Sequence, residues 1–468
     1  MPESLMTNAL PLPRRGSFGI AILLGVWAGG VALAPSWPVK AALVAPALLI
    51  PGIWWMLQRP LRWVTVFLAA TILLPPLPIA LGDSGPHPAL AIAAFGLLAG
   101  AIWLPRWRIA LSGPGAALTF LSFVLAASLA PAALTAGPEA VAAAAARVGL
   151  FAIAPFVYLY VSQGPAGRCD KLRLTRALFA MATLSAAFAC VDFYFQFPAP
   201  AGFGAQYIWV DSEVYRRAQG LFYEASTLGN FCVFFLTMAA AAIAKGIEIP
   251  RLLLATGVPL LTGALVLSFS RGSLVALAFA LGVLAWMHRR KIAAGKLALW
   301  FLVAAPAAAW LLRRTVPAVV EHYWLRLSLS AEFLFSSTEG VLSGRVASWR
   351  TLLAWMSDHP WQLLTGIGYK TLPYTSHLGQ PVVADNMYLS LLIETGIAGL
   401  AALLWLNLSI LRASLRASRS ADRHRSFLGC WMFCFWAAES VQMFSGDLLT
   451  YWRVLPIYFF VLGLAVRE

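Results

Sequence analysis

The stretch SHLGQPVVADNMYLSLLIETGIAGL, from Ser376 to Leu400, decides the fold class. It begins as a polar segment punctuated by glycine and proline, which is typical of a loop. At Asn386 it passes into an apolar run that extends to Leu411, long enough to cross a bilayer as one helix. Asp385 therefore lies at the mouth of a predicted membrane helix and Glu394 inside it, where a charged group is costly and usually functional.

The composition of the whole chain agrees with this stretch. Of 468 residues, 60% are hydrophobic and 11% are charged, whereas a soluble domain carries about 25% charged residues. The net charge is +15, but the lysines and arginines form short clusters between apolar runs, as the positive-inside rule requires. The sequence thus indicates an integral membrane protein and disfavours a nucleic-acid-binding protein.

Apolar runs of spanning length recur along the chain and predict an all-α, polytopic helical bundle of about 12–14 transmembrane helices, one membrane domain over residues 1–468. The runs are Gly16–Ala34, Val39–Leu57, Trp63–Leu81, Pro88–Leu104, Gly115–Ala133, Val148–Val161, Leu178–Phe195, Ser226–Ala244, Leu252–Phe269, Leu274–Met287, Leu297–Leu312, Met387–Leu411, Phe427–Met443 and Trp452–Val466. Basic clusters fall on alternate loops, so both termini are expected in the cytoplasm. A large loop, 313–385, is expected on the opposite side and to be partly helical, because apolar residues recur at helical spacing in Arg345–Trp361.

Ionisable residues gather at one predicted interface rather than at mid-membrane depth. On this topology they lie at the outer ends of spans or in the adjoining loop: Asp192, Arg216, Arg217, Glu224, Arg271, Asp385, Glu394 and Glu439. A secondary transporter would place its coupling carboxylates near the midplane on broken helices. The distribution therefore favours an enzyme site at one face.

Asp385 and Glu394 are nine residues apart, about half a turn round one helix, so the two carboxylates are expected to have different roles. Asp385 has an alternative interpretation as the cap of the helix that begins at Asn386. Glu394 has an alternative interpretation as a residue that bonds to a neighbouring helix. Gly396 and Gly399 have an alternative interpretation as positions where two helices approach closely. Arg271 could snorkel from a span junction.

Three segments resemble successive motifs of the O-antigen ligase and Wzy-type polysaccharide polymerase superfamily. They are RRAQGLFYEASTLGNF at Arg216–Phe231, LSFSRGSLVALAFALG at Leu267–Gly282, and GIGYK…ADNMYLSLLIETGIAGL at Gly366–Leu400. Asn386, Gly396 and Gly399 fit the spacing of the last motif in the ligases. Asp385 stands where the ligases have histidine, and this departure favours a polymerase.

The resemblance implies a multi-pass glycosyltransferase of the GT-C type at the periplasmic face of the bacterial inner membrane. It implies a donor glycan on undecaprenyl pyrophosphate and no metal, cofactor or nucleotide sugar. The acceptor would be a lipid-linked repeat unit for a polymerase, or lipid A-core or a protein for a ligase. A flippase or exporter of lipid-linked glycans is the alternative from another class.

This chemistry assigns roles to the clustered residues. Breaking a sugar–pyrophosphate bond leaves negative charge that arginines can stabilise, and the acceptor hydroxyl needs a base. Arg217 and Arg271 are the predicted pyrophosphate ligands and are expected to converge on one anionic group. Asp385 is the predicted catalytic base. The further candidates are Arg216 and Arg345 for the pyrophosphate, and Glu224, Asn386, His377 and Glu394 for the pocket.

Overall fold

The computed structural model describes residues 15–79, 85–110, 113–164, 170–200, 203–210, 213–289, 345–372 and 384–467, and the single residues 314, 321 and 382. It divides into two compact units, residues 1–62 and 63–468. In the first unit, the indole N–H of Trp27 in α1 (Arg15–Leu33) donates to the carbonyl oxygen of Leu43 in α2 (Trp37–Leu57) at 2.8 Å.

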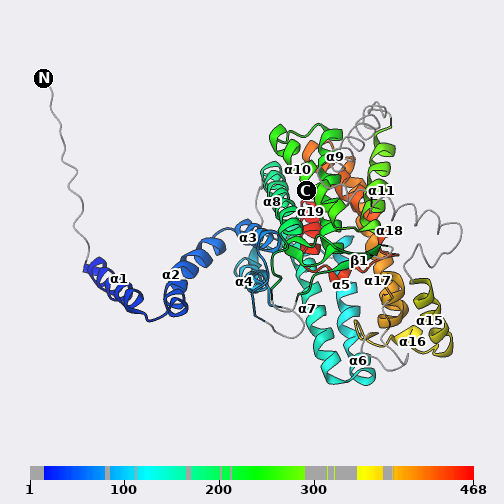
Figure 1. The fold of residues 1–468 in the computed structure, drawn as a ribbon, viewed down its shortest axis with the longest axis horizontal. Coiled ribbons are helices and arrows are strands. Elements are labelled where there is room, and N and C mark those ends of the chain that lie inside the picture. The colour runs from blue at the N-terminus through cyan, green and yellow to red at the C-terminus, as the bar shows by residue number, and fades with distance from the viewer. Residues whose placement is uncertain are drawn as a thin grey trace. The chain divides into compact units, whose positions relative to one another are not determined.

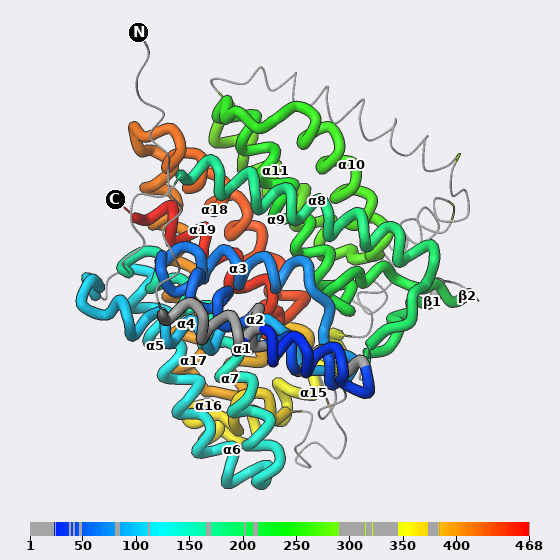
Figure 2. The backbone as a smooth tube through the Cα atoms, turned by 90° about the vertical axis from the view of Figure 1, so that its left-hand side faces the viewer, coloured from blue at the N-terminus to red at the C-terminus, as the bar shows by residue number. Residues whose placement is uncertain are grey.

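The second unit is a bundle of helices with one small hairpin (Figures 1 and 2). In chain order its first elements are α3 (Pro60–Leu73, which begins in the first unit), α4 (Pro88–Ile102), η1 (Leu104–Arg106), α5 (Pro114–Ala127), α6 (Leu129–Thr135), α7 (Gly137–Ser162) and α8 (Lys171–Phe195). They are followed by β1 (Tyr207–Val210), β2 (Glu213–Arg216), η2 (Gly220–Phe222), α9 (Ala225–Lys245), α10 (Arg251–Leu267) and α11 (Arg271–His288). The last are α15 (Arg345–Asp358), α16 (Gln362–Thr365), α17 (Met387–Ser418), α18 (Arg423–Gln442), η5 (Leu448–Thr450) and α19 (Leu455–Val466).

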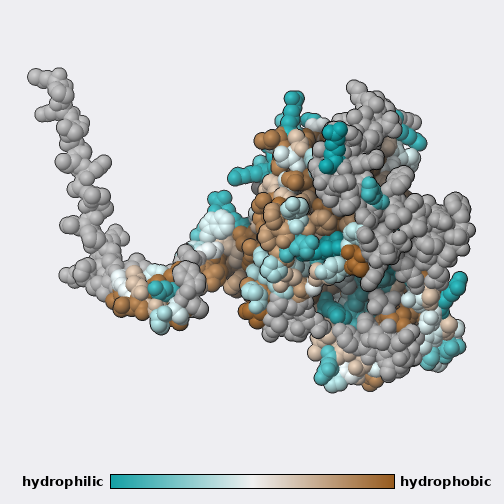
Figure 3. Space-filling model, viewed as in Figure 1, coloured by the Kyte–Doolittle hydropathy of each residue, from teal (hydrophilic) through white to brown (hydrophobic). Residues whose placement is uncertain are grey.

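The prediction of an all-α polytopic membrane protein is confirmed. Among the described residues six helices are long and apolar enough to cross a membrane: Pro114–Thr135, Gly137–Ser162, Lys171–Phe195, Ala225–Lys245, Arg271–His288 and Met387–Ser418. Phe123 of α5 and Leu252 of α10 are largely exposed. Figure 3 shows patches of hydrophobic residues on the face of the second unit that it presents. An outward-facing apolar surface is what a lipid environment selects. The predicted span Leu297–Leu312 lies outside the described residues.

Helix α9 forms the centre of the bundle. Its aromatic residue Phe234 packs against Trp431 of α18 and Tyr458 of α19, with ring centroids 4.4 Å apart in both pairs. The Trp431 indole N–H also donates to the Phe234 carbonyl oxygen at 2.8 Å. Such ring packing adds to the burial of large apolar area, so α9, α18 and α19 form a fixed framework.

Helix α17 is not the single straight span that its apolar run predicts. Gly396 has φ 70° and ψ −170°, which breaks the helix, and the side chains of Tyr388 and Asn407 lie 3.3 Å apart. In a straight helix these positions, 19 residues apart, would be about 28 Å apart at 1.5 Å per residue. The two parts, 387–395 and 397–418, therefore fold back on each other.

The loop 366–372 stabilises the break at Gly396. The N–H groups of Ile367 and Gly368 donate to the carbonyl oxygens of Ile393 and Glu394, at 3.1 and 2.8 Å. A continuous helix would satisfy those carbonyls internally. Because the loop supplies replacement donors, the backbone can leave the helix without leaving buried polar groups unpaired.

Candidate active site

The connection between α18 and α19, residues 443–454, gathers segments that are far apart in sequence. The Met387 N–H at the start of α17 donates to the Met443 carbonyl oxygen at 2.9 Å. Gly272 of α11 lies beside Ser445, since a β-carbon there would be 3.4 Å from its hydroxyl oxygen. Asp447 forms an ion pair with Lys370. This end of the bundle is therefore where the predicted site residues have to meet.

The segments that carry Arg217 and Arg271 meet. The Ala218 N–H donates to the Leu267 carbonyl oxygen at 2.8 Å, and Arg217 Nε donates to the Ser268 carbonyl oxygen at 2.9 Å. Arg271 follows three residues later, at the start of α11, whose cap is Ser270. Arg217 is thus bonded to the α10–α11 connection, and Arg271 lies at the end of that connection.

Glu224 lies near Arg217, just before α9. Its carboxylate accepts a hydrogen bond from the Thr227 hydroxyl at 2.6 Å. Burial raises the pKa of Glu224, while the Thr227 bond and the charge of Arg217 act in the opposite direction. Glu224 is therefore a partly buried carboxylic group near a cation.

Arg216 has a different environment from Arg217. Its guanidinium lies 3.5 Å from the Asp192 carboxylate at the end of α8, and both side chains are largely buried. This ion pair ties β2 to α8. Since its charge is already offset by Asp192, Arg216 is a poorer pyrophosphate candidate than Arg217.

The sequence left two interpretations open for Asp385, as the catalytic base and as the cap of α17. The Asn386 side chain accepts from the N–H groups of Tyr388 and Leu389 at 3.1 Å each, so Asn386 is the cap of α17. The interpretation of Asp385 as the cap is therefore wrong. Asp385 has φ 44°, and its half-exposed carboxylate pairs with Arg345 Nε of α15 at 3.1 Å.

Glu394 lies at the far end of the 387–395 part, buried to 2% exposure. The backbone N–H groups of Lys370 and Leu372 donate to its carboxylate. The carboxylate is therefore bonded to backbone groups of the 366–372 loop. The prediction of one continuous helix up to Leu411 is wrong, because α17 turns back at Gly396.

Lys370 is a residue whose role sequence reasoning missed, although it ends the quoted GIGYK motif. Its ammonium pairs with Asp447. Burial alone would lower the pKa of Lys370, but the carboxylates of Asp447 and Glu394 raise it. Arg147 of α7 donates to the Lys370 carbonyl oxygen at 3.2 Å. The loop 366–372 is therefore fixed between α7, α17 and the 443–454 connection.

Strained backbone gathers at the same end of the bundle. In the described ranges the non-glycine residues with positive φ are Gln196, Tyr223, Phe269, Lys370 and Asp385. Four of them lie within two residues of a helix end, and Lys370 lies in the 366–372 loop that contacts the 443–454 connection. Such conformations cost about 1–3 kcal/mol each and cluster at functional sites, so this end is a better candidate than the opposite one.

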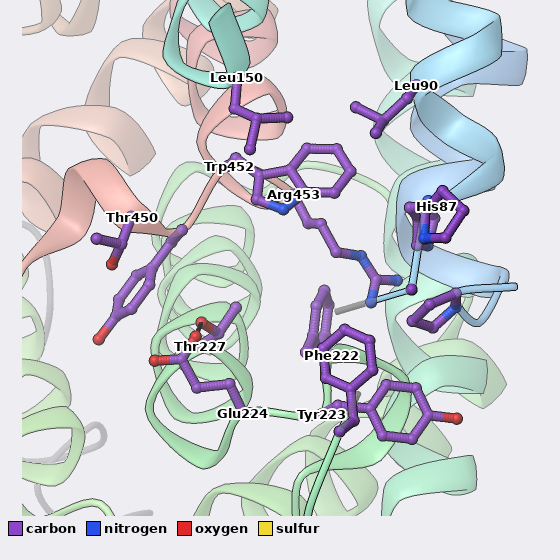
Figure 4. A pocket seen from close by; sticks show the side chains of 15 residues that line it. His87, Leu90, Leu150, Phe222, Tyr223, Glu224, Thr227, Thr450, Trp452 and Arg453 are labelled. Atoms are coloured by element: carbon purple, nitrogen blue, oxygen red, sulfur yellow. Dashed lines mark hydrogen bonds between the residues drawn. The ribbon is translucent and has the colours of Figure 1, made fainter. Parts of the chain in front are cut away.

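A cavity of about 310 Å³ lies beside Glu224 (Figure 4). Its aromatic residues are Phe203, Phe222, Tyr223, Tyr451 and Trp452, and its polar ones are His87, Glu224, Thr227, Thr450 and Arg453. Of the predicted site residues that the structure describes, Glu224 alone lines it. Arg217, Arg271 and Asp385 do not.

His87 serves the structure of this cavity and not proton transfer. Its Nδ1 accepts from the Ala89 N–H at 3.1 Å, and its Nε2 lies 2.8 Å from the Leu74 carbonyl oxygen. Burial, with the charge of Arg453, lowers the pKa of His87 to about 4. The imidazole is therefore neutral, with both nitrogens engaged.

The described residues do not test two of the predictions. His377 lies outside the described residues. Among the residues that the structure describes, no three His, Cys, Asp or Glu side chains lie together as metal ligands would, and the absence of a metal stays a prediction.

The fold and the charged end define a polytopic helical membrane protein with a candidate site where several helix ends meet. Residues 256–404 match the family model for Wzy_C, described as O-antigen ligase. No curated protein matches the chain. The matched region contains Arg271, Arg345, Lys370, Asp385 and Glu394. Over this part of the chain the match supports the O-antigen ligase and Wzy-type superfamily, in agreement with the resemblance seen in the motifs.

The match sets the general class. An O-antigen ligase match indicates a membrane enzyme of the glycan ligase or polymerase class, which implies a lipid-linked glycan and an acceptor as substrates. Arg217, Glu224 and Asp447 lie outside the matched residues, yet they contact or face elements within them. The candidate site is therefore completed by segments on both sides of the matched region.

Proposed function

We propose that this protein polymerises polysaccharide repeat units by transferring a growing glycan from undecaprenyl pyrophosphate to the next lipid-linked unit. The observation that carries the proposal is that Arg217 is bonded to the α10–α11 connection, which leads directly into Arg271, and that Glu224 lies near Arg217. A buried diphosphate needs more than one cation to offset its desolvation. Two arginines from separate motifs that meet at one short connection fit that need.

The acceptor side of the reaction is assigned to Asp385. Its carboxylate is half exposed, which leaves it accessible to a hydroxyl group, and the Arg345 ion pair orients it. A carboxylate is a weak base, so Asp385 would orient the hydroxyl and accept its proton late in the transition state. Asp447, held by Lys370, is the next candidate if Asp385 does not serve.

The end of the bundle at which the site lies also supports a periplasmic reaction in the bacterial inner membrane. Arg173 and Arg176 start α8, while Asp192 lies near its other end, next to Arg216. Basic residues likewise surround the start of α18 at Arg423–Arg425. By the positive-inside rule those basic ends face the cytoplasm, so the site end faces outward.

Ligation to lipid A-core is the alternative within the superfamily, and Asp385 in place of a histidine disfavours it. Flipping or export of lipid-linked glycan is the alternative from another class. One observation favours it: Glu394 is a buried carboxylate next to a helix break, an arrangement that transporters use. The transfer assay below separates these alternatives.

The purified chain in nanodiscs, given an undecaprenyl-pyrophosphate-linked oligosaccharide and no nucleotide sugar, should form longer lipid-linked glycans. Chelation of divalent metals by EDTA should not reduce the rate. Addition of lipid A-core should not divert the product. Movement of the donor between leaflets without any new glycosidic bond would contradict the proposal and favour a flippase.

Substitution of the arginines tests their role. Arg217→Gln and Arg271→Gln should each lower transfer by at least tenfold, and Arg271→Lys should restore only part of it, because lysine cannot bond a diphosphate bidentately. Arg173→Gln, an exposed arginine at the opposite end of α8, is the matched control. Equal loss in all three glutamine variants would contradict a specific role.

A further inference from the structure

We infer that the cavity beside Glu224 binds a neutral sugar ring of the glycan, and not the diphosphate or the polyprenyl chain. This inference rests on the proposed function and adds a subsite to it. The cavity lies between the 443–454 connection, η2, α7 and the start of α4 (Figure 4). Its charge, lining and size each limit what it can hold.

The charges disfavour a phosphate group. Arg453 Nε and Nη2 donate to the Thr71 carbonyl oxygen at 3.2 and 2.6 Å, and Nη1 donates to the Leu221 carbonyl oxygen. All three guanidinium nitrogens are therefore engaged by backbone, and the group also lies over the Phe222 ring at 4.8 Å. Glu224 is an acidic group in the same cavity, so an anionic ligand would meet a carboxylate and a committed arginine.

The lining and the size disfavour a polyprenyl chain. Glu224, Thr227 and Thr450 would lose hydration against a hydrocarbon without gaining a partner, which costs several kcal/mol for each buried polar group. The volume of about 310 Å³ is at the lower end of the ligand-pocket range of about 300–1,000 Å³. That space fits a group of sugar-ring size and not a long chain.

A sugar ring fits the charge, the lining and the size of the cavity. It has hydroxyl groups that can bond to a carboxylate and to threonine hydroxyls, and C–H faces that pack on aromatic rings. The cavity supplies both kinds of group, with Tyr223 and Trp452 among the rings. Figure 4 shows Glu224 and Thr227 together on one side of it and Arg453 reaching toward His87 on the other.

Tyr223 is held in a conformation that its own preferences oppose. Its φ is 56°, which is uncommon for a residue with a bulky side chain. Gln219 Nε2 donates to the Tyr223 carbonyl oxygen at 2.8 Å, and the Phe203 ring lies 5.2 Å from the tyrosine ring. Strain maintained by surrounding contacts is typical of ligand-binding positions.

The test is direct binding of free sugars to the purified full chain in nanodiscs. Galactose, glucose, N-acetylglucosamine and rhamnose are the probes, and saturation-transfer NMR and calorimetry are the measurements. Leu90→Trp should fill the cavity and lower the affinity of the bound sugar at least tenfold. Leu97→Trp, on the same helix but 63% exposed, is the matched control and should bind as wild type.

Glu224→Gln provides a second variant that keeps the shape of the side chain. It should weaken binding of the same sugar by about threefold to thirtyfold, the loss expected when a hydrogen bond to a charged group becomes neutral. If Leu90→Trp does not fold, as judged by size-exclusion chromatography, the sugar affinity of Glu224→Gln tests the inference instead. No binding of any probe to wild type, or unchanged binding in Glu224→Gln, would overturn the inference.

Kinetics distinguish whether the ring belongs to donor or acceptor. With the lipid-linked donor saturating, a cavity variant that raises only the KM for the acceptor glycan places the acceptor sugar there, and the converse places the donor sugar. Transfer that persists in Leu90→Trp with unchanged KM for both substrates overturns the cavity assignment and leaves the proposed function intact. Sugar binding without any transfer by wild type contradicts the proposed function and leaves the cavity assignment intact.

Discussion

At the scale of single residues, two neighbours in the sequence have separate tasks. Asn386 satisfies the first N–H groups of α17, so Asp385 is not needed as a cap. A left-handed backbone at Asp385 turns its side chain to Arg345, and aspartate tolerates that conformation better than most residues. The carboxylate is thus available for chemistry without cost to the helix start.

Asp385→Asn should reduce transfer by about a hundredfold or more, because general-base catalysis contributes roughly 10²–10⁴. The fold should be kept, since capping by Asn386 is untouched. The measurement is the initial rate of transfer per folded molecule. Asp358→Asn, an exposed aspartate at the end of α15, is the control.

Near wild-type transfer by Asp385→Asn would exclude Asp385 as the base and direct the search to Asp447, Glu224 or His377.

Glu394→Gln should affect folding more than catalysis. It removes a buried charge next to Lys370, so folded yield should fall more than turnover per folded molecule.

His87 makes stability depend on pH in a predictable direction. Its pKa falls from 6.5 in the unfolded chain to about 4 in the fold, so the unfolded chain binds the extra proton first as pH falls. Stability is therefore full above pH 6.5 and decreases as pH falls toward 4, by about 3 kcal/mol at most. His87→Asn, which can keep the cap to Ala89, should show a smaller decrease in thermal midpoint over that range. An identical pH dependence in both proteins would contradict the assignment.

At the scale of elements, the turn within α17 determines the geometry of the site. Part 387–395 runs from the 443–454 connection to the 366–372 loop, and part 397–418 runs back past Tyr388. The position of Asp385 near Met443 therefore depends on a break ten residues beyond the cap. Helix α17 and the loop form one structural unit.

Gly396→Ala should break that unit. A β-carbon there would lie 2.3 Å from the Leu364 carbonyl oxygen, at a φ of 70°, so both sterics and backbone conformation oppose it. We expect a loss of about 2–4 kcal/mol, measured as a lower thermal midpoint in detergent. Gly282→Ala in α11, where a β-carbon meets nothing within 4 Å, should be neutral or stabilising. Equal midpoints for Gly396→Ala and wild type would contradict the role of the break.

At the scale of the whole molecule, charge is arranged by face. Figures 1 and 2 both place α6, α15 and α16 at one end of the second unit, with α10 and α11 toward the other. The basic starts of α8 and α18 belong to the end away from the candidate site. This asymmetry is the basis for the predicted orientation, with both termini in the cytoplasm and 313–385 outside.

Cysteine labelling tests the orientation. In a chain with its own five cysteines replaced, His377→Cys should react with a membrane-impermeant maleimide added from the periplasmic side. Arg173→Cys should react only after the membrane is permeabilised. The reverse pattern would place the candidate site in the cytoplasm and exclude a periplasmic reaction.

The sequence by itself determined the class of fold and the face on which charge collects. Hydrophobic length is a local property, so runs such as Ser226–Ala244 and Leu252–Phe269 correspond to α9 and α10 within a few residues. The family motifs also predicted that the segments of Arg217 and Arg271 meet. These features depend on residues that are close in sequence or on a known motif order.

Only the tertiary structure decided which charges pair and where α17 turns. An apolar run reads as one straight helix whether or not a distant loop supplies donors to its carbonyls, so the break at Gly396 is invisible without the 366–372 loop. Arg216 and Arg217 are adjacent in sequence, yet one meets Asp192 and the other meets Ser268. Lys370 and Asp447 are 77 residues apart. Pairing at such separations follows from packing, because no local pattern specifies the partner of a charge.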